Sequence, residues 1–352
     1  MDTKADNTWQ RNKTADFLKG IAVLLMIQVH IMELFAKQEI LDGTFGKVSL
    51  FLGGPPAAPV FMAVMGYFIF YSGKSLNQNL IRALKLFFGG ILLNIGLNLN
   101  LLLSIYHGKF ELNPWHYVFG ADILPLAGLS IAGLAFIKRF FRTGPLPYLL
   151  LLVIFSFIST RLPDITDNSD SIKAYIQAFF WGQYKWSYFP FLPWFIYPLA
   201  GYTFALVRTL YEDNLKAVNI RPVIIISTLF LIFTFKYAAD ITHNLQIYYH
   251  HDEVFVGWVL IFLGVWILLN HFTLKLTDGN MFSKYIQWLG KNVTAAYVIQ
   301  WLIVGNIATE IFKTQNVLNI TLWFAAITAA VSLFVLMYEK MIRKIQSNKS
   351  VN

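Results

Sequence analysis

The sequence predicts an all-α, polytopic membrane protein with about ten transmembrane helices. Of its 352 residues, 57% are apolar and only 13% are charged, and the mean hydropathy is +0.55. This balance is far from that of a soluble globular domain. Apolar runs recur along the chain at about the length that a helix needs to cross a bilayer roughly 30 Å thick. These runs lack the strict two-residue alternation of an outer-membrane barrel.

Ten apolar runs are the candidate spans, of which the fifth is short. They cover approximately 15–36, 57–73, 80–105, 117–138, 145–160, 190–208, 222–239, 254–271, 286–308 and 317–338. The longest connection between them, about 161–188, is too short for a core of its own. We therefore expect one transmembrane domain over 15–338, between an N-terminal tail at 1–14 and a basic C-terminal tail at 339–352.

The distribution of Lys and Arg predicts the orientation, because cytoplasmic connections carry an excess of these residues. Alternate connections hold Lys4, Arg11 and Lys13; Arg82 and Lys85; Lys138, Arg139 and Arg142; Arg208, Lys216 and Arg221; Lys275 and Lys284; and Lys340, Arg343 and Lys344. The intervening connections include the acidic set Asp164, Asp167 and Asp170. Both termini are then cytoplasmic, in a multi-pass protein of the cell (plasma or inner) membrane. The net charge of +9 indicates contact with anionic membrane lipid and not with nucleic acid.

Lys19 and His30 are the most informative pair of residues, because both lie inside the first apolar run. An unpaired charge in hydrocarbon costs several kcal/mol, so such residues usually have a function. Eleven positions are about three helical turns, which places both side chains on one face, roughly 16 Å apart along the axis. The geometry suits a path with an anionic ligand at one end and proton chemistry at the other. The alternative for His30 is a hydrogen bond between helices.

Arg82 and Lys85 lie at the cytoplasmic start of the third run, on the same side of the membrane as Lys19. Three cations there are able to hold a multiply phosphorylated ligand. For Arg82 and Lys85 the alternative is simple positive-inside anchoring, with the charged heads extended to the membrane surface.

A second polar group is expected in the outer half of the membrane. Glu33 follows His30 by three residues, so it shares a helix face with the imidazole and is placed to orient it. Asp122 starts the fourth run; Asn113 and His116 come just before it, and Gln300 lies in the outer part of the ninth run. The alternatives are a solvated Glu33 and an Asp122 that only stabilises a helix start.

The segment 188–202 contains Pro190, Pro193 and Pro198, which predicts a broken or kinked span that lines a cavity. Asn94 and Asn98, four residues apart, are expected to make hydrogen bonds between helices. We predict no metal site. The chain has no cysteine, and the adjacent side chains of His250 and His251 diverge with no third ligand at a useful spacing.

Five stretches of the sequence resemble one known superfamily. RNKTADFLKGIAVLLMIQVH resembles the opening of the transmembrane acyltransferase superfamily, where an Arg-x10-His motif begins the first span, and R-x-x-K at 82–85 resembles its R-x-x-R. These motifs are shared with acyltransferase family 3. ADILPLAG, YFPFLPWFIYPLAGY and WLGKNVTAAYVIQWLI resemble the heparan-α-glucosaminide N-acetyltransferase-like branch. The likeness extends over about residues 11–308.

The resemblance implies transfer of an acyl group, often acetyl, from cytoplasmic acyl-CoA to a hydroxyl or amine of a sugar at the outer face. Lys19 takes the place of the motif's Arg, and His30 that of its catalytic His. We expect catalytic roles for His30, Glu33 and Asp122; acyl-CoA contacts from Lys19, Arg82 and Lys85; and acceptor contacts from Asn113, His116, Trp194 and Gln300. Lys at 19 and 85 lacks the bidentate fork of Arg, and Gln300 stands where relatives often have His.

The main alternative is a transporter or flippase for a glycan or lipid precursor, with His30 and Glu33 as a proton relay. Paired broken helices in two related halves would indicate it, and the sequence does not show them. The sequence leaves open the acceptor, the acyl chain, and O- versus N-transfer. It also leaves open whether His30 is a base or an acylated intermediate, and whether the protein forms a homo-oligomer.

Overall fold

The structure is a computed structural model that describes residues 12–141, 144–162 and 170–349. Its regular elements are helices, accompanied by two isolated bridges at Ala36–Gln315 and Ala121–Ser187. The helices are α1 Lys13–Phe35, α2 Gln38–Asp42, α3 Thr44–Gly53, α4 Ala58–Tyr71, α5 Leu76–Leu97, α6 Leu99–Tyr106, α7 Pro114–Val118, α8 Ile123–Phe140, α9 Leu146–Ser159, α10 Ile172–Ala178, α11 Phe191–Trp194, α12 Ile196–Leu210, α13 Glu212–Ala217, α14 Arg221–Phe233, α15 Phe235–His243, α16 Leu245–Tyr249, α17 Glu253–Thr277, α18 Met281–Lys291, α19 Val293–Ile311 and α20 Val317–Lys349. The predicted all-α class is confirmed.

Several of these helices are long and apolar enough to cross a membrane, as expected for a multi-pass protein. Among the described residues there are six, or seven if the pair α14 and α15, bent by 55°, forms one span. The six are α1, α3 with α4, α5, α8, α17 and α20. Each of the ten predicted runs falls on one helix or on two consecutive helices. The count of ten is not confirmed, because α9 and α12 have only 14 and 15 residues and α19 is also not among the helices that are long and apolar enough.

The proline-rich run is broken, as its composition predicts. A non-helical Leu192, with φ −104° and ψ 125°, interrupts α11 before α12 begins. The third run is also divided, because α5 ends at Leu97 and α6 begins at Leu99. Asn98 lies at this break, and its side chain donates to the carbonyl of Asn94 at 3.0 Å.

Helix α1 lies at the centre of the bundle and contacts α3, α4, α17, α18, α19 and α20. Its contact with α18 is close because each helix presents a glycine at the crossing. Gly20 lies against the backbone of Ile286, and Gly290 lies against the backbone of Asp16. Small residues let two helix backbones approach in this way. The crossing fixes α1 against α18. It therefore also fixes the position of His30 relative to α19, the helix that follows α18 in the chain.

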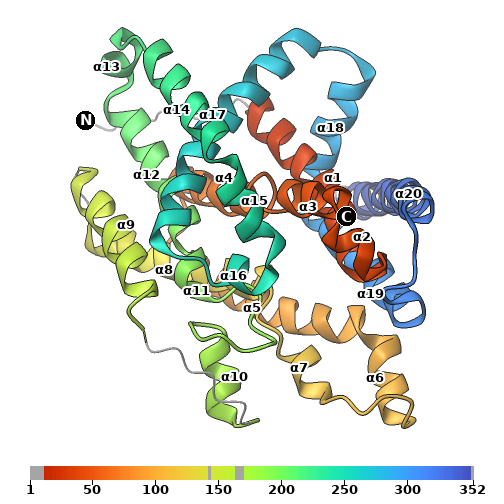
Figure 1. The fold of residues 1–352 in the computed structure, drawn as a ribbon. Helices are drawn as coiled ribbons and strands as arrows, with labels where there is room; N and C mark the ends of the chain where they lie inside the picture. Colours follow the sequence, from red (N-terminus) through yellow and green to blue (C-terminus); the bar gives the residue numbers. More distant parts are fainter. Residues whose placement is uncertain (1–11, 142–143, 163–169, 350–352) are drawn as a thin grey trace.

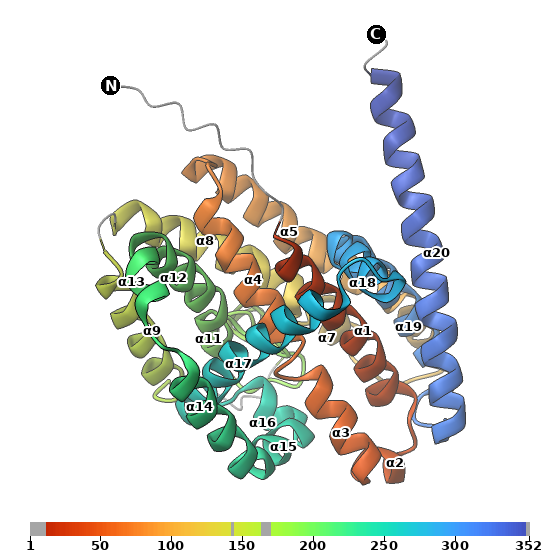
Figure 2. The same cartoon turned by 90° about the horizontal axis from the view of Figure 1, so that it is seen from above.

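The two ends of the bundle carry different elements. Figure 1 shows the start of α1, α13 and the α17–α18 connection towards one end, and α6, α7 and α10 at the opposite end. Figure 2 shows α20 along one side, with its last turns extending beyond the other helices. Residues 339–349, expected as part of a tail, continue this helix. Most of the predicted N-terminal tail lies outside the described residues, as do Lys4, Arg11, Arg142, Asp164 and Asp167.

Candidate active site

The three residues predicted to be catalytic line one cavity of about 450 Å³. His30 and Glu33 come from α1, and Asp122 comes from the start of α8, about ninety positions further along the chain. A small adjoining cavity of about 40 Å³ is also lined by His30, Glu33 and Asp122. The fold therefore joins an imidazole and two carboxyl groups around one space, which is the arrangement that acid–base chemistry needs.

The His30 imidazole is held by two consecutive residues of α19. Its ring stacks on the Trp301 ring with the centroids 3.9 Å apart, and Nδ1 lies 3.3 Å from Oε1 of Gln300. An amide oxygen can only accept a hydrogen bond, so this assignment places the ring hydrogen on Nδ1. Nε2 then keeps its lone pair and is the proton acceptor of the ring. From the sequence we expect Gln300 to contact the acceptor substrate, and Trp301 is not among the residues expected at the site.

Asp122 links the start of α8 to α19. Its Oδ1 accepts from the Ile123 amide at 2.6 Å. Asp122 thus caps the start of α8, which is the role given above as its alternative to catalysis. Its Oδ2 accepts from the Tyr297 hydroxyl at 3.0 Å. Both carboxylate oxygens are therefore engaged within the protein. This holds the cavity wall formed by α8 against the helix that carries Gln300.

Asn94 and Asn98 make the contacts between elements that their spacing predicts. Asn94 donates to the carbonyls of Val118 and Gly120, at 3.2 and 2.9 Å, and Asn98 donates to the carbonyl of Tyr117 at 3.4 Å. Both asparagines also line the large cavity. They therefore fix the connection that leads from α7 to Asp122.

The segment before α11 completes the wall of the cavity. The Ala121 amide donates to the Trp186 carbonyl at 2.7 Å, and the Phe189 amide donates to the Ala121 carbonyl at 2.6 Å. These two bonds fasten the segment beside Asp122. Tyr188 and Phe189 thereby become lining residues, and both belong to the proline-rich segment 188–202, which the sequence predicts to line a cavity.

The comparison with known families agrees with this geometry. The family model Acyl_transf_3, described as an acyltransferase domain, matches residues 12–339. The chain belongs to this acyltransferase family. No curated protein and no solved structure matches it. The predicted resemblance is confirmed at the level of the family, but not for the heparan-α-glucosaminide branch. Together with the long apolar helices, the family indicates a multi-pass membrane acyltransferase.

His116, also expected to contact the acceptor in this acyltransferase, lines the large cavity that contains His30. Its Nε2 lies 2.7 Å from Oδ1 of Asp170, and its ring stacks on Trp186 with the centroids 4.1 Å apart. The hydrogen bond to His116 lowers the pKa of the Asp170 carboxyl. His116 thus ties α7 to the segment that precedes α10.

Asn113 and Trp194 are not among the residues that line the cavity. The Asn113 side chain accepts from the Trp115 amide at 3.0 Å and donates to the Tyr175 hydroxyl at 3.2 Å. Trp194 is completely buried, and its Nε1 donates to the carbonyl of Tyr249, a lining residue, at 2.9 Å. Trp194 therefore reaches the cavity only through Tyr249.

The three cations assigned to acyl-CoA are not among the residues that line this cavity. Lys19 Nζ lies 2.9 Å from Oδ1 of Asp16, and its side chain is 17% exposed. The same ammonium lies 5.5 Å from the centre of the Phe68 ring. Arg82 and Lys85 are exposed on α5.

His251 has two hydrogen-bond partners that account for its burial. Its Nε2 lies 2.7 Å from the Tyr197 hydroxyl, and its Nδ1 lies 2.7 Å from the Tyr248 carbonyl oxygen. Over the part of the chain that the structure describes, there is no group of three or more His, Asp or Glu side chains placed to hold a metal ion.

Proposed function

We propose that this acyltransferase moves an acyl group, in the first instance acetyl, from cytoplasmic acyl-CoA to a hydroxyl or amine of a sugar or glycan at the outer face. The observation that supports the proposal is the His30 cavity, where an imidazole with a free proton-accepting nitrogen faces the same space as Glu33 and Asp122. Imidazole is well suited to take a proton near neutral pH.

The proposed reaction begins when Nε2 of His30 takes the proton from the acceptor's O–H or N–H. The acceptor oxygen or nitrogen then bonds to the thioester carbonyl carbon, and the carbon–sulfur bond breaks. The departing thiolate recovers the proton from the imidazolium, so His30 returns to its starting state. Gln300 and Trp301 hold the ring in the orientation that this transfer needs.

The remaining predicted residues take supporting roles in this proposal. His116 lines the cavity and is proposed to contact the acceptor, while Asn113 and Trp194 position the wall. Lys19, Arg82 and Lys85 are proposed to contact the phosphates of acyl-CoA on the cytoplasmic side, because phosphate is favoured by several cations together.

The proposal is tested by the transfer reaction itself. The purified full chain, supplied with acetyl-CoA and a panel of saccharide acceptors, should release free CoA. One acceptor should gain the mass of an acetyl group in mass spectrometry. If no CoA is released with any acceptor, and acetyl-CoA does not bind, the assignment of the donor is wrong.

We also propose that the chain crosses the membrane ten times with both termini cytoplasmic. The separation of the start of α1 and α13 from α6, α7 and α10 supports this orientation (Figure 1). A reporter fused after residue 170 should therefore be active only in the outer compartment. Cytoplasmic activity of that fusion would contradict the proposed topology.

Neutralising Lys19 or Arg82 should weaken acetyl-CoA binding if these residues contact its phosphates. A hydrogen bond to a charged group contributes about 1.5–3 kcal/mol, so Lys19→Gln and Arg82→Gln should each lose roughly ten- to a hundredfold in affinity, measured by calorimetric titration. Lys19→Arg should preserve binding.

The Lys19 variant needs a control, because Lys19 also pairs with the buried Asp16 carboxylate. Asp16→Asn alone keeps the Lys19 charge, and the double variant Asp16→Asn with Lys19→Gln removes both charges. Binding should be retained in the first and lost in the second. Unchanged affinity in both Lys19→Gln and Arg82→Gln would remove these residues from the donor site.

A further inference from the structure

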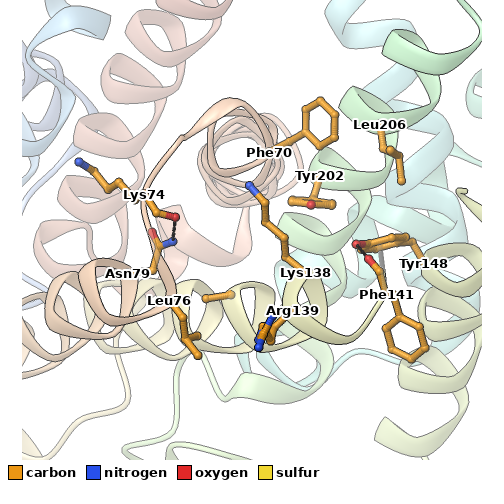
Figure 3. Close-up of a pocket in the computed structure, with 11 residues that line it drawn as sticks. Phe70, Lys74, Leu76, Asn79, Lys138, Arg139, Phe141, Tyr148, Tyr202 and Leu206 are labelled. Atoms are coloured by element: carbon orange, nitrogen blue, oxygen red, sulfur yellow. Dashed lines mark hydrogen bonds between the residues drawn. The ribbon is translucent and has the colours of Figure 1, made fainter. Parts of the chain in front are cut away.

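A second cavity, of about 410 Å³, lies at the opposite end of α5 and α8 from the first. It forms where α4 ends, α5 begins and α8 ends, and α9 and α12 contribute aromatic side chains to it (Figure 3). Three lining residues are cations, namely Lys74, Lys138 and Arg139, and none is acidic. Such a concave group of like charges favours an anionic ligand.

The three cations are not neutralised by the described part of the chain. Lys138 Nζ donates to the Ser72 carbonyl at 3.3 Å, which holds it at the end of α4. None of Lys74, Lys138 and Arg139 forms an ion pair with a carboxylate of the described residues. Figure 3 shows the Lys74 ammonium turned away from Lys138 and Arg139, so the positive charge available to a ligand in the cavity is that of Lys138 and Arg139.

Asn79, another lining residue, carries a buried oxygen that lacks a hydrogen-bond donor. The residue is only 3% exposed, and its Nδ2 donates to the Lys74 carbonyl at 3.2 Å. Its Oδ1 has no partner among the described residues. This oxygen has almost no accessible surface, so Asn79 contributes to the cavity by holding the start of α5 through its bond to Lys74.

The surroundings of the cavity are apolar and exposed. On α8, Phe140 is 76% exposed. On α9, Leu146, Leu149 and Leu150 are exposed, and Tyr148 is the buried residue of that helix. Figure 2 shows α8 and α9 at the edge of the bundle. A ligand held by its phosphate would thus have apolar protein surface on which to lay acyl chains.

The cavity is separate from the candidate active site. The two cavities share no lining residue. Asp122 and Lys138 stand sixteen positions apart on α8, which is roughly 24 Å along the helix. The fully buried Ile131 and the buried Ala83 pack together in the core between them.

We propose that this cavity binds the headgroup of an anionic phospholipid. The phosphate lies beside Lys138 and Arg139, and the acyl chains lie along α8 and α9. Basic pockets between transmembrane helices on the cytoplasmic side are where such headgroups bind. This proposal does not depend on the acyl-transfer reaction.

The test is native mass spectrometry of the full chain in detergent, titrated with phosphatidylglycerol or phosphatidylcholine. The unmodified protein should retain phosphatidylglycerol at least roughly tenfold better. The double variant Lys138→Gln with Arg139→Gln should lose roughly ten- to a hundredfold of that binding, because charged hydrogen bonds are removed. The control is Lys275→Gln with Lys284→Gln, which lowers the net charge equally at exposed positions on α17 and α18, and it should bind like the unmodified protein.

Thermal unfolding of each variant checks that it is folded. Two outcomes overturn the proposal: equal losses in the lysine control, or release of the lipid by inorganic phosphate or acetyl-CoA. The last result would assign the cavity to a soluble phosphate ester.

Discussion

Replacing His30 by alanine should abolish acyl transfer while the protein still inserts and folds. The imidazole is the proposed base, and general acid–base catalysis contributes roughly 10²- to 10⁴-fold to a rate. The side chain lines a cavity, so its removal enlarges existing space without adding a clash. Activity is measured as CoA release and acceptor acetylation, and folding as the melting temperature in detergent.

Two further variants make the result specific to the base at this position. His30→Gln should be as inactive as His30→Ala, because an amide does not accept a proton at neutral pH. His107→Ala should keep full activity, because His107 is exposed at the end of α6 and hydrogen bonds only within its own turn. Near-normal transfer by His30→Ala would exclude His30 as the catalytic base.

Placing a methyl group at Gly20 or Gly290 should strongly destabilise the protein. A Cβ at Gly20 would overlap the backbone carbonyl of Ile286, and one at Gly290 would overlap that of Asp16. A backbone cannot move aside as a flexible side chain does, so α1 and α18 must separate. Overpacking typically costs about 1–3 kcal/mol and occasionally more. Gly20→Ala and Gly290→Ala should therefore lower the melting temperature, and transfer activity should fall with it because α1 carries His30.

The same substitution at an open position gives the matched control. Gly89 on α5 and Gly264 on α17 have no atom within 4 Å of an added Cβ. Alanine there should be neutral, or stabilise by up to about 1 kcal/mol through its higher helix propensity. If all four variants melt at the same temperature as the unmodified protein, the close crossing of α1 and α18 is not what holds the bundle together.

Features that depend on neighbours along the chain can be predicted from the sequence alone. Apolar runs of membrane length predict helices, because a backbone in lipid must satisfy its own hydrogen bonds. The three-residue spacing of His30 and Glu33 places both on one face, and both do line one cavity. The prolines of 188–202 predict a break, because proline removes a helical hydrogen bond. The shared motifs also identified the acyltransferase family.

Contacts between residues far apart in the chain become evident in the fold. Gln300 contacts His30 across 270 positions, and Trp301 stacks on the same ring. Lys74 on the α4–α5 turn comes together with Lys138 and Arg139 at the end of α8. Helical periodicity specifies the face on which a side chain lies, but not which helix packs against that face. That choice depends on the packing of whole helices, such as the glycine crossing of α1 and α18, which local spacing does not encode.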